Sequence, residues 1–189
     1  MLKFLLKKNV IAISLFLVTI NCFAVDKIQY KQTAFGISEK EFLAKFKNDN
    51  FKCVTTKDGQ SRSCESTIAT YSNQKTARTW ANFYQNLLYG VTIHFEYENQ
   101  RDGEFNKKII LDSLKNKFGK PLDTKNSTEK INGISLKNEE YTWANVDDAS
   151  LVCTITDADG FTFVAVGMRS VSIFEKVKNE NKKSKLTDM

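Results

Sequence analysis

The 189-residue sequence contains one histidine, one proline and no long apolar run. Because His94 is the only histidine, any Ser–His or Cys–His catalysis must use it. His94, Cys53, Cys64 and Cys153 do not follow a known spacing of zinc ligands, so we predict no metal site and no cofactor. The apolar run Val10–Ile20 has 11 residues, whereas a membrane-spanning helix needs roughly 20. This run therefore does not predict a membrane span.

The first 24 residues have the three parts of a secretory signal: a lysine-rich start, the apolar run and a small-x-small site at Cys22-Phe23-Ala24. We expect cleavage after Ala24, which leaves a periplasmic or secreted chain that begins at Val25. Cys22 could instead carry a lipid anchor. Such cysteines normally follow a small residue, whereas Asn21 precedes Cys22, so we expect no anchor.

The charge of the sequence excludes a dense basic surface. Removal of the signal, with its three lysines, lowers the net charge from +6 to +3. A near-balanced exported protein lacks the basic patch that nucleic acid requires, so we predict no nucleic-acid partner. Residues 179–189 are predicted to form a disordered basic tail, with peripheral contact to an anionic membrane or sugar as the alternative. The lysines near this end are Lys176, Lys178, Lys182, Lys183 and Lys185.

Export also suggests how the cysteines pair, because thiols oxidise outside the cytoplasm. Cys53 and Cys64 are placed symmetrically about Asp58-Gly59. A two-residue hairpin turn there would bring them directly opposite each other. We predict a Cys53–Cys64 disulfide, which leaves Cys153 unpaired.

In the first half, Ser38 and Glu41 form a capping box that predicts a helix over 39–47. The two disulfide-linked segments, 51–56 and 61–71, are predicted to be strands. Further strands are predicted over 76–88 and over 90–98, where apolar and polar residues alternate.

In the second half, a turn over 99–103 is expected before an amphipathic helix. Gly119 and Pro121 end this helix, and 121–133 is predicted to be a polar connection. The apolar stripe of the helix consists of Phe105, Ile109, Ile110, Leu111, Leu114 and Phe118. Strands are predicted over 139–144, 150–156 and 161–168, the last two as a hairpin, and Ser172 with Glu175 predicts a short closing helix.

This element order, with no long crossovers between strands, predicts an α+β fold in which helices pack on one face of an antiparallel sheet. Residues 25–178 would form one domain. The tetrapeptide Thr-Trp-Ala-Asn occurs at 79–82 and again at 142–145. This suggests two tandem helix-plus-sheet units over 34–98 and 104–170, with Trp80 and Trp143 in equivalent places.

The stretch Phe35-Gly36-Ile37-Ser38-x-x-Glu41-Phe42-Leu43 resembles the start of the first helix in SmpA/BamE-like envelope proteins and in the β-lactamase inhibitor protein. The paired cysteines that follow are also similar to the first repeat of that inhibitor. The resemblance covers residues 34–65. It implies a binding protein of the cell envelope with an antiparallel sheet as its contact surface.

We find no catalytic motif. Cys153 shares a strand face with Leu151 and Ile155, whereas His94 lies on a polar face, so a Cys153–His94 pair would join residues that face opposite ways. The run Asp157-Ala158-Asp159-Gly160 begins like a calcium loop, but position 12 is Met168 instead of a glutamate, which favours a hairpin turn.

Aromatic residues on strands are the best candidates for binding, because Tyr and Trp bury a large area for little conformational entropy. We select Trp80, Tyr84, Tyr97 and Trp143, with core packing of the tryptophans as the alternative. The sequence thus predicts a non-enzymatic envelope protein that binds another protein, as a scaffold, inhibitor or immunity-type module. The alternatives are a thiol hydrolase using Cys153 and His94, and a lipid- or glycan-binding module.

Overall fold

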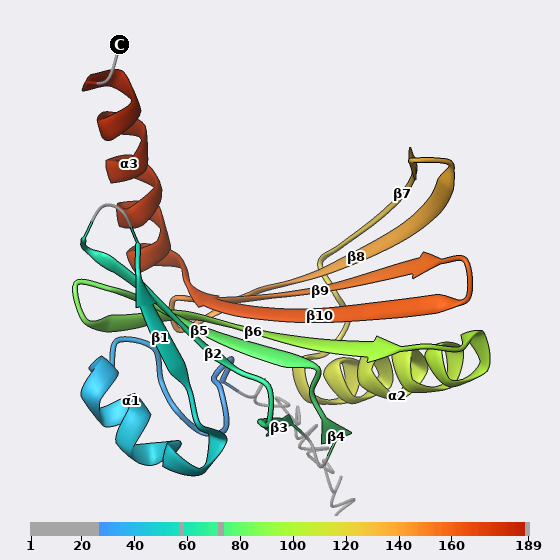
Figure 1. The fold of residues 1–189 in the computed structure, drawn as a ribbon, viewed down its shortest axis with the longest axis horizontal. Helices are drawn as coiled ribbons and strands as arrows, with labels where there is room; N and C mark the ends of the chain where they lie inside the picture. The colour runs from blue at the N-terminus through green and yellow to red at the C-terminus, as the bar shows by residue number, and fades with distance from the viewer. Residues whose placement is uncertain (1–26, 57–58, 72–73, 188–189) are drawn as a thin grey trace, which may run out of the picture.

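The computed structural model describes residues 27–56, 59–71 and 74–187, and for 144–146 and 181–187 it describes the backbone alone. Within these ranges the chain forms an eight-stranded antiparallel sheet, a two-stranded sheet and three α-helices (Figure 1). The predicted α+β class is confirmed. The predicted signal, with Cys22 and the cleavage site at Ala24, lies outside the described residues.

The strands of the large sheet lie in the order β1-β2-β5-β6-β10-β9-β8-β7, and β3 pairs with β4. The helical elements are α1 (Glu39–Lys45), the 3-10 turn η1 (Lys47–Asp49), α2 (Gln100–Phe118) and α3 (Val171–Thr187). The strands before α2 are β1 (Lys52–Thr55), β2 (Ser61–Ser66), β3 (Thr70–Tyr71), β4 (Gln74–Lys75), β5 (Arg78–Tyr84) and β6 (Leu87–Tyr97). Those after it are β7 (Asp123–Ile131), β8 (Ile134–Val146), β9 (Ala149–Ala158) and β10 (Phe161–Ser170).

Helix α1 begins as its capping box predicts. The Glu41 amide donates to Ser38 Oγ (3.2 Å), and the Ser38 amide donates to the Glu41 carboxylate (3.0 Å). Ser38 Oγ also donates to the Glu41 carboxylate (2.7 Å), and this bond, together with the one from the Ser38 amide, lowers the pKa of Glu41. The helix places Phe42 in the core, where its ring contacts Phe83 at a centroid distance of 5.5 Å.

Strands β1 and β2 pair in the predicted register, with Cys53 opposite Cys64. The two cysteines form the predicted disulfide, and Cys153 is a buried free thiol. The disulfide ties β1, which is an edge strand of the sheet, to its only neighbour in the sheet order.

Helix α2 starts before the predicted turn has ended. Asn99 caps it by accepting a hydrogen bond from the Asp102 amide (2.8 Å), so the segment predicted as a turn belongs largely to the helix. Two members of the predicted stripe are exposed instead of buried: Phe105 is 66% exposed and Ile109 is 41% exposed. The residues that face the sheet are Ile110, Leu111, Leu114 and Phe118.

The prediction of a polar connection over 121–133 is wrong, because most of it forms β7. All nine residues of β7 are exposed, and they pair with β8 along its length. With no buried face, β7 has no alternation of apolar residues to indicate a strand. The three strands predicted next are confirmed as β8, β9 and β10, and β9 and β10 form the predicted hairpin around Asp159 and Gly160.

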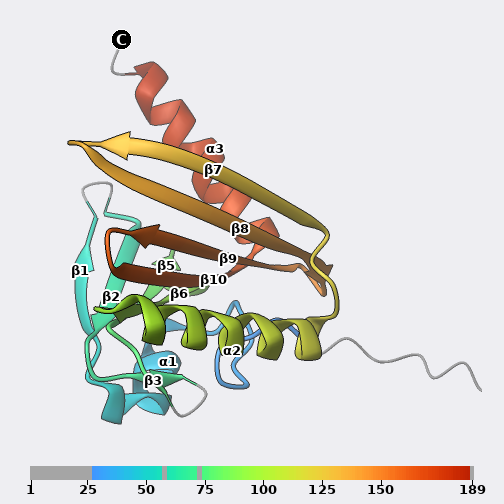
Figure 2. The same cartoon turned by 90° about the vertical axis from the view of Figure 1, so that its right-hand side faces the viewer.

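Helices α1 and α2 cover one face of the sheet, while α3 rises from the opposite side (Figures 1 and 2). The expectation that all helices share one face therefore fails for α3. Helix α3 begins at Val171 because Ser170 and Asp148 cap it, in place of the predicted Ser172–Glu175 box. Ser170 Oγ accepts from the Ile173 amide (3.3 Å), and the Asp148 carboxylate accepts from the Ser172 amide (2.9 Å).

Helix α3 continues to Thr187, whereas the sequence predicts a disordered tail over 179–189. No glycine or proline interrupts residues 171–187, and lysine, glutamate and leucine are good helix formers. Among the helices that the structure describes, none has both the length and the apolar character needed to cross a membrane.

The two Thr-Trp-Ala-Asn copies do not occupy equivalent places. Trp80 lies in β5, which is the third strand of the large sheet after α1. Trp143 lies in β8, which is the second strand of that sheet after α2. Their side chains also lie on opposite faces of the sheet. Phe42 and Phe105 share the spacing of the tryptophans, yet Phe42 is fully buried and Phe105 is exposed.

Candidate functional site: the open face of the sheet

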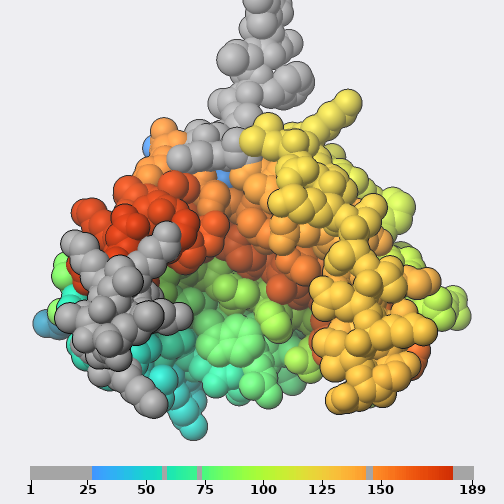
Figure 3. Space-filling view, turned by 90° about the horizontal axis from the view of Figure 1, so that it is seen from above, coloured from blue at the N-terminus to red at the C-terminus, as the bar shows by residue number. Residues whose placement is uncertain are grey.

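Among the residues that the structure describes, few cover the sheet surface opposite α1 and α2, and this surface is concave (Figure 3). We call this surface the open face. Seen from that side, it forms a recess between α3 and the strands β7 and β8, with β5, β6, β9 and β10 as its floor (Figure 3). Strand pairing places Trp80, Thr92 and Gly167 side by side on this face, and His94 beside Ala165.

Of the four predicted contact residues, Trp80 lies on the open face. It is half-buried, and its ring meets the ring of His94 edge-on at a centroid distance of 4.8 Å. Burial lowers the pKa of His94; Arg78 lowers it further, whereas the charge of Glu96 raises it. The Arg78 guanidinium forms an ion pair with Glu65 (3.4 Å) on the same face. The floor near Trp80 thus combines two rings with charged groups of both signs.

The other three predicted contact residues are not on the accessible part of this face. Trp143 is 2% exposed, and its indole Nε1 donates to the Gly119 carbonyl (2.9 Å). Tyr84 is 4% exposed, and its hydroxyl lies within hydrogen-bond distance of two acceptors, the Gln60 amide oxygen (3.1 Å) and the Glu180 carboxylate of α3. Tyr97 faces the helix-covered side and donates to Gln74 (3.3 Å). Trp143 is therefore a core residue, which is the alternative that the sequence allows for the tryptophans.

The sequence reasoning missed several residues of the open face. Phe161 and Phe163 of β10 are 49% and 37% exposed, and their rings lie parallel with centroids 6.4 Å apart. Arg169 belongs to the same side of the strand and extends over the ring of Phe174 of α3. The alternation along β10 was the available signal: its buried residues predict which side chains of that strand face away from the core.

Cys153 and His94 do not form a site. Cys153 pairs across the sheet with Val166 and faces the core, whereas His94 lies on the open face beside Ala165. Burial and the nearby Glu139 raise the pKa of the Cys153 thiol to about 12. A buried protonated thiol and an imidazole on the opposite face cannot act on a common substrate.

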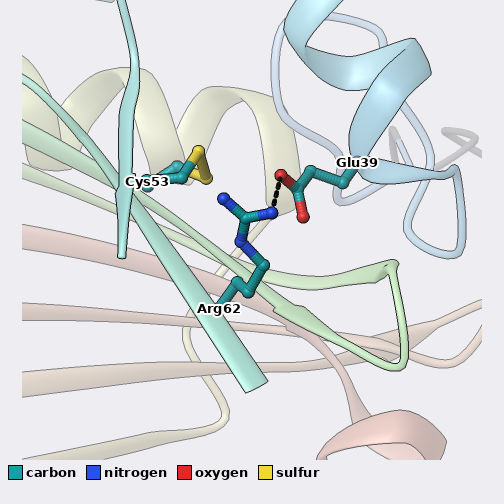
Figure 4. Close-up of a disulfide and its surroundings, with 4 residues drawn as sticks. Glu39, Cys53 and Arg62 are labelled. Atoms are coloured by element: carbon teal, nitrogen blue, oxygen red, sulfur yellow. Dashed lines mark ion pairs between the residues drawn. A yellow bond between two sulfur atoms is a disulfide. The ribbon is translucent and has the colours of Figure 1, made fainter. Parts of the chain in front are cut away.

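The disulfide lies on the helix-covered face beside an ion pair between Arg62 and Glu39 (3.1 Å), as Figure 4 shows. Glu39, Cys53 and Cys64 place a carboxylate oxygen and two sulfurs within 4.8 Å of one another. The sulfurs are bonded to each other, so neither is a thiolate that could bind a metal. This cluster is a structural feature that fastens α1 to β2.

No known protein family and no curated protein matches the sequence.

Proposed function

We propose that this protein is an exported, non-enzymatic envelope protein that binds another protein through its open face, as a scaffold, inhibitor or immunity-type module. The observation that carries the proposal is the concave eight-stranded sheet with one uncovered face (Figure 3). The aromatic rings on that face, half-buried Trp80 and exposed Phe161 and Phe163, are residue types enriched at protein interfaces.

The strand order supports a tandem origin for this surface, in line with the resemblance over residues 34–65. Each of the helices α1 and α2 is followed by four strands of the large sheet, and the last strand of each set, β6 or β10, lies at the centre. We propose that the chain consists of two helix-plus-sheet units that together build one continuous contact surface. The disulfide is compatible with export and, together with the expected signal, supports a proposal that this binding occurs in the periplasm or outside the cell.

The test is affinity capture from an envelope extract with the mature protein, residues 25–189. We expect the wild type to retain a defined protein, and the variant Phe163→Glu to lose it, because a charge replaces an exposed aromatic ring of β10, a central strand of the sheet. Phe105→Glu is the matched control, since Phe105 is exposed on α2, away from the open face. If no protein is retained, or if both variants retain it equally, the proposal fails.

A further inference from the structure

A hollow of about 230 Å³ lies in the open face where α3 leaves the sheet. Its floor includes Gly90, Gly167 and Val152, and its walls include Tyr89, Phe174 and Arg169. The rings of Tyr89 and Phe174 lie 6.5 Å apart, so the hollow is bounded by aromatic surface on the side of α3.

Gly167 has no side chain to fill the floor of this hollow, and the fold does not require a glycine at this position. It lies inside β10, where glycine weakens a strand, and its φ is not in the left-handed region. Apart from the adjacent residues of the chain, the nearest described atom to a Cβ at this position would be the Val152 carbonyl oxygen, at 3.8 Å, which is ordinary contact. Neither the backbone nor the packing requires glycine here. A missing side chain inside a strand often marks a place where another molecule approaches closely.

The wall formed by Arg169 is cationic and available for contact. The guanidinium lies over the Phe174 ring, 3.9 Å from its centroid, and Nε donates to Ser150 Oγ (3.3 Å). Within the part of the chain that the structure describes, no carboxylate forms an ion pair with Arg169, which is exposed. Helix α3 beside it contains five lysines and two glutamates, so its charge is also positive.

We infer that this hollow receives an acidic segment of the protein partner, with an Asp or Glu carboxylate bound by Arg169. This inference rests on the proposed function and specifies its partner. The remaining guanidinium N–H groups suit a carboxylate, to which arginine can donate two parallel hydrogen bonds. The Phe174 ring holds the guanidinium in place, and the glycine floor lets the backbone of the partner approach the sheet.

The experiment is selection of random peptides displayed on phage against the immobilised mature protein, followed by affinity measurement with synthetic copies of the selected peptides. We expect the selected peptides to share an Asp or Glu. Arg169→Gln should weaken their binding by about tenfold or more, because a hydrogen bond to a charged group is lost. Gly167→Val should weaken it independently by filling the hollow, and binding should decrease as salt rises.

Arg101→Gln, the same change on α2, is the control and should bind like the wild type. Thermal melting of each variant checks that it folds. The inference is overturned if no peptide is selected, if the peptides lack an acid, or if Gly167→Val and Arg169→Gln both bind as well as the wild type. It is also overturned if phosphatidylglycerol vesicles bind the wild type while the peptides do not. The affinity capture described above tests the proposed function separately. If it identifies a protein partner while the peptide experiment fails, the acidic-segment inference is wrong and the proposed function stands.

Discussion

His94 couples the stability of the fold to pH. Burial lowers its pKa from the ordinary value of 6.5, so the unfolded chain takes up a proton at a higher pH than the folded protein does. As the pH falls through 6.5, the free energy of unfolding therefore decreases. The decrease ends once the pH is below the pKa of His94 in the folded protein. At pH values well above 6.5 both states are unprotonated at His94, and the residue contributes no pH dependence.

We predict that His94→Gln has a flatter dependence of unfolding free energy on pH than the wild type between about pH 7.5 and pH 5. Urea denaturation at several pH values measures this. His94 is the only histidine, so no other imidazole confuses the comparison. Identical slopes for the two proteins would show that the imidazole is not desolvated in the folded state.

The two tryptophans show what the sequence does not reveal about a residue. Both stand in Thr-Trp-Ala-Asn, yet Trp143 is in the core and Trp80 is on the open face. Which face a strand residue takes depends on the register against its neighbours, and a shift of one residue reverses it. By contrast, the Cys53–Cys64 pair was predictable because a hairpin fixes the register of its own two strands.

At the scale of elements, α2 can lie close to the sheet because Gly103 has no side chain. A Cβ on Gly103 would lie 2.2 Å from Oγ1 of Thr162, which is a buried residue of β10. Thr162 Oγ1 is held in place by donating to the Asp157 carboxylate (2.7 Å). The glycine in the helix is thus required by the contact with the strand.

We predict that Gly103→Ala destabilises the protein by about 1–3 kcal/mol, although alanine is the better helix former, because overpacking outweighs propensity. Gly167→Ala is the matched control, since its Cβ meets no atom closer than 3.8 Å. Its unfolding free energy should stay equal to that of the wild type or rise slightly. Chemical denaturation of both variants decides the question, and a stabilised Gly103→Ala would contradict the described helix–sheet contact.

The elements that the sequence predicts well are those with a local signal. The capping box gives the start of α1, and alternation gives β6, β9 and β10. Strand β7 has no such signal, because its nine residues are exposed and it is defined by its pairing with β8. The start of α3 was misplaced because its cap comes partly from Asp148, which is distant in the sequence.

For the whole molecule, we predict that the exported protein lacks its signal and contains one disulfide and one free thiol. Protein produced from the full sequence in a host with an export pathway should have the mass of residues 25–189 less two hydrogens. One thiol, Cys153, should react with an alkylating reagent, and it should do so only after unfolding, because it is fully buried.

Mass spectrometry before and after denaturation and alkylation tests this prediction. Cys153→Ala is the control, which should leave no reactive thiol. A mass that includes residues 1–24, or three reactive thiols in the exported protein, would contradict the expected cleavage and oxidation.

The fold class was accessible from the sequence because it depends on the order of elements, whereas the face that stays open depends on where each helix packs. The apolar stripe of α2 indicates that the helix packs on the sheet. The sequence of residues 171–187 does not indicate that α3 packs on the opposite face. Its position depends on contacts with residues outside the helix, namely Asp148, Tyr89 and Arg169.

The pairing of β6 with β10 also has a consequence for folding kinetics. Within the described large sheet, every other strand pairing joins strands that follow one another along that part of the chain, so each can form early from nearby residues. Only β6 and β10 must meet across α2 and three intervening strands. We therefore expect two rapidly formed meanders whose union at β6–β10 is the slow step, and the concave surface exists only once that step is complete.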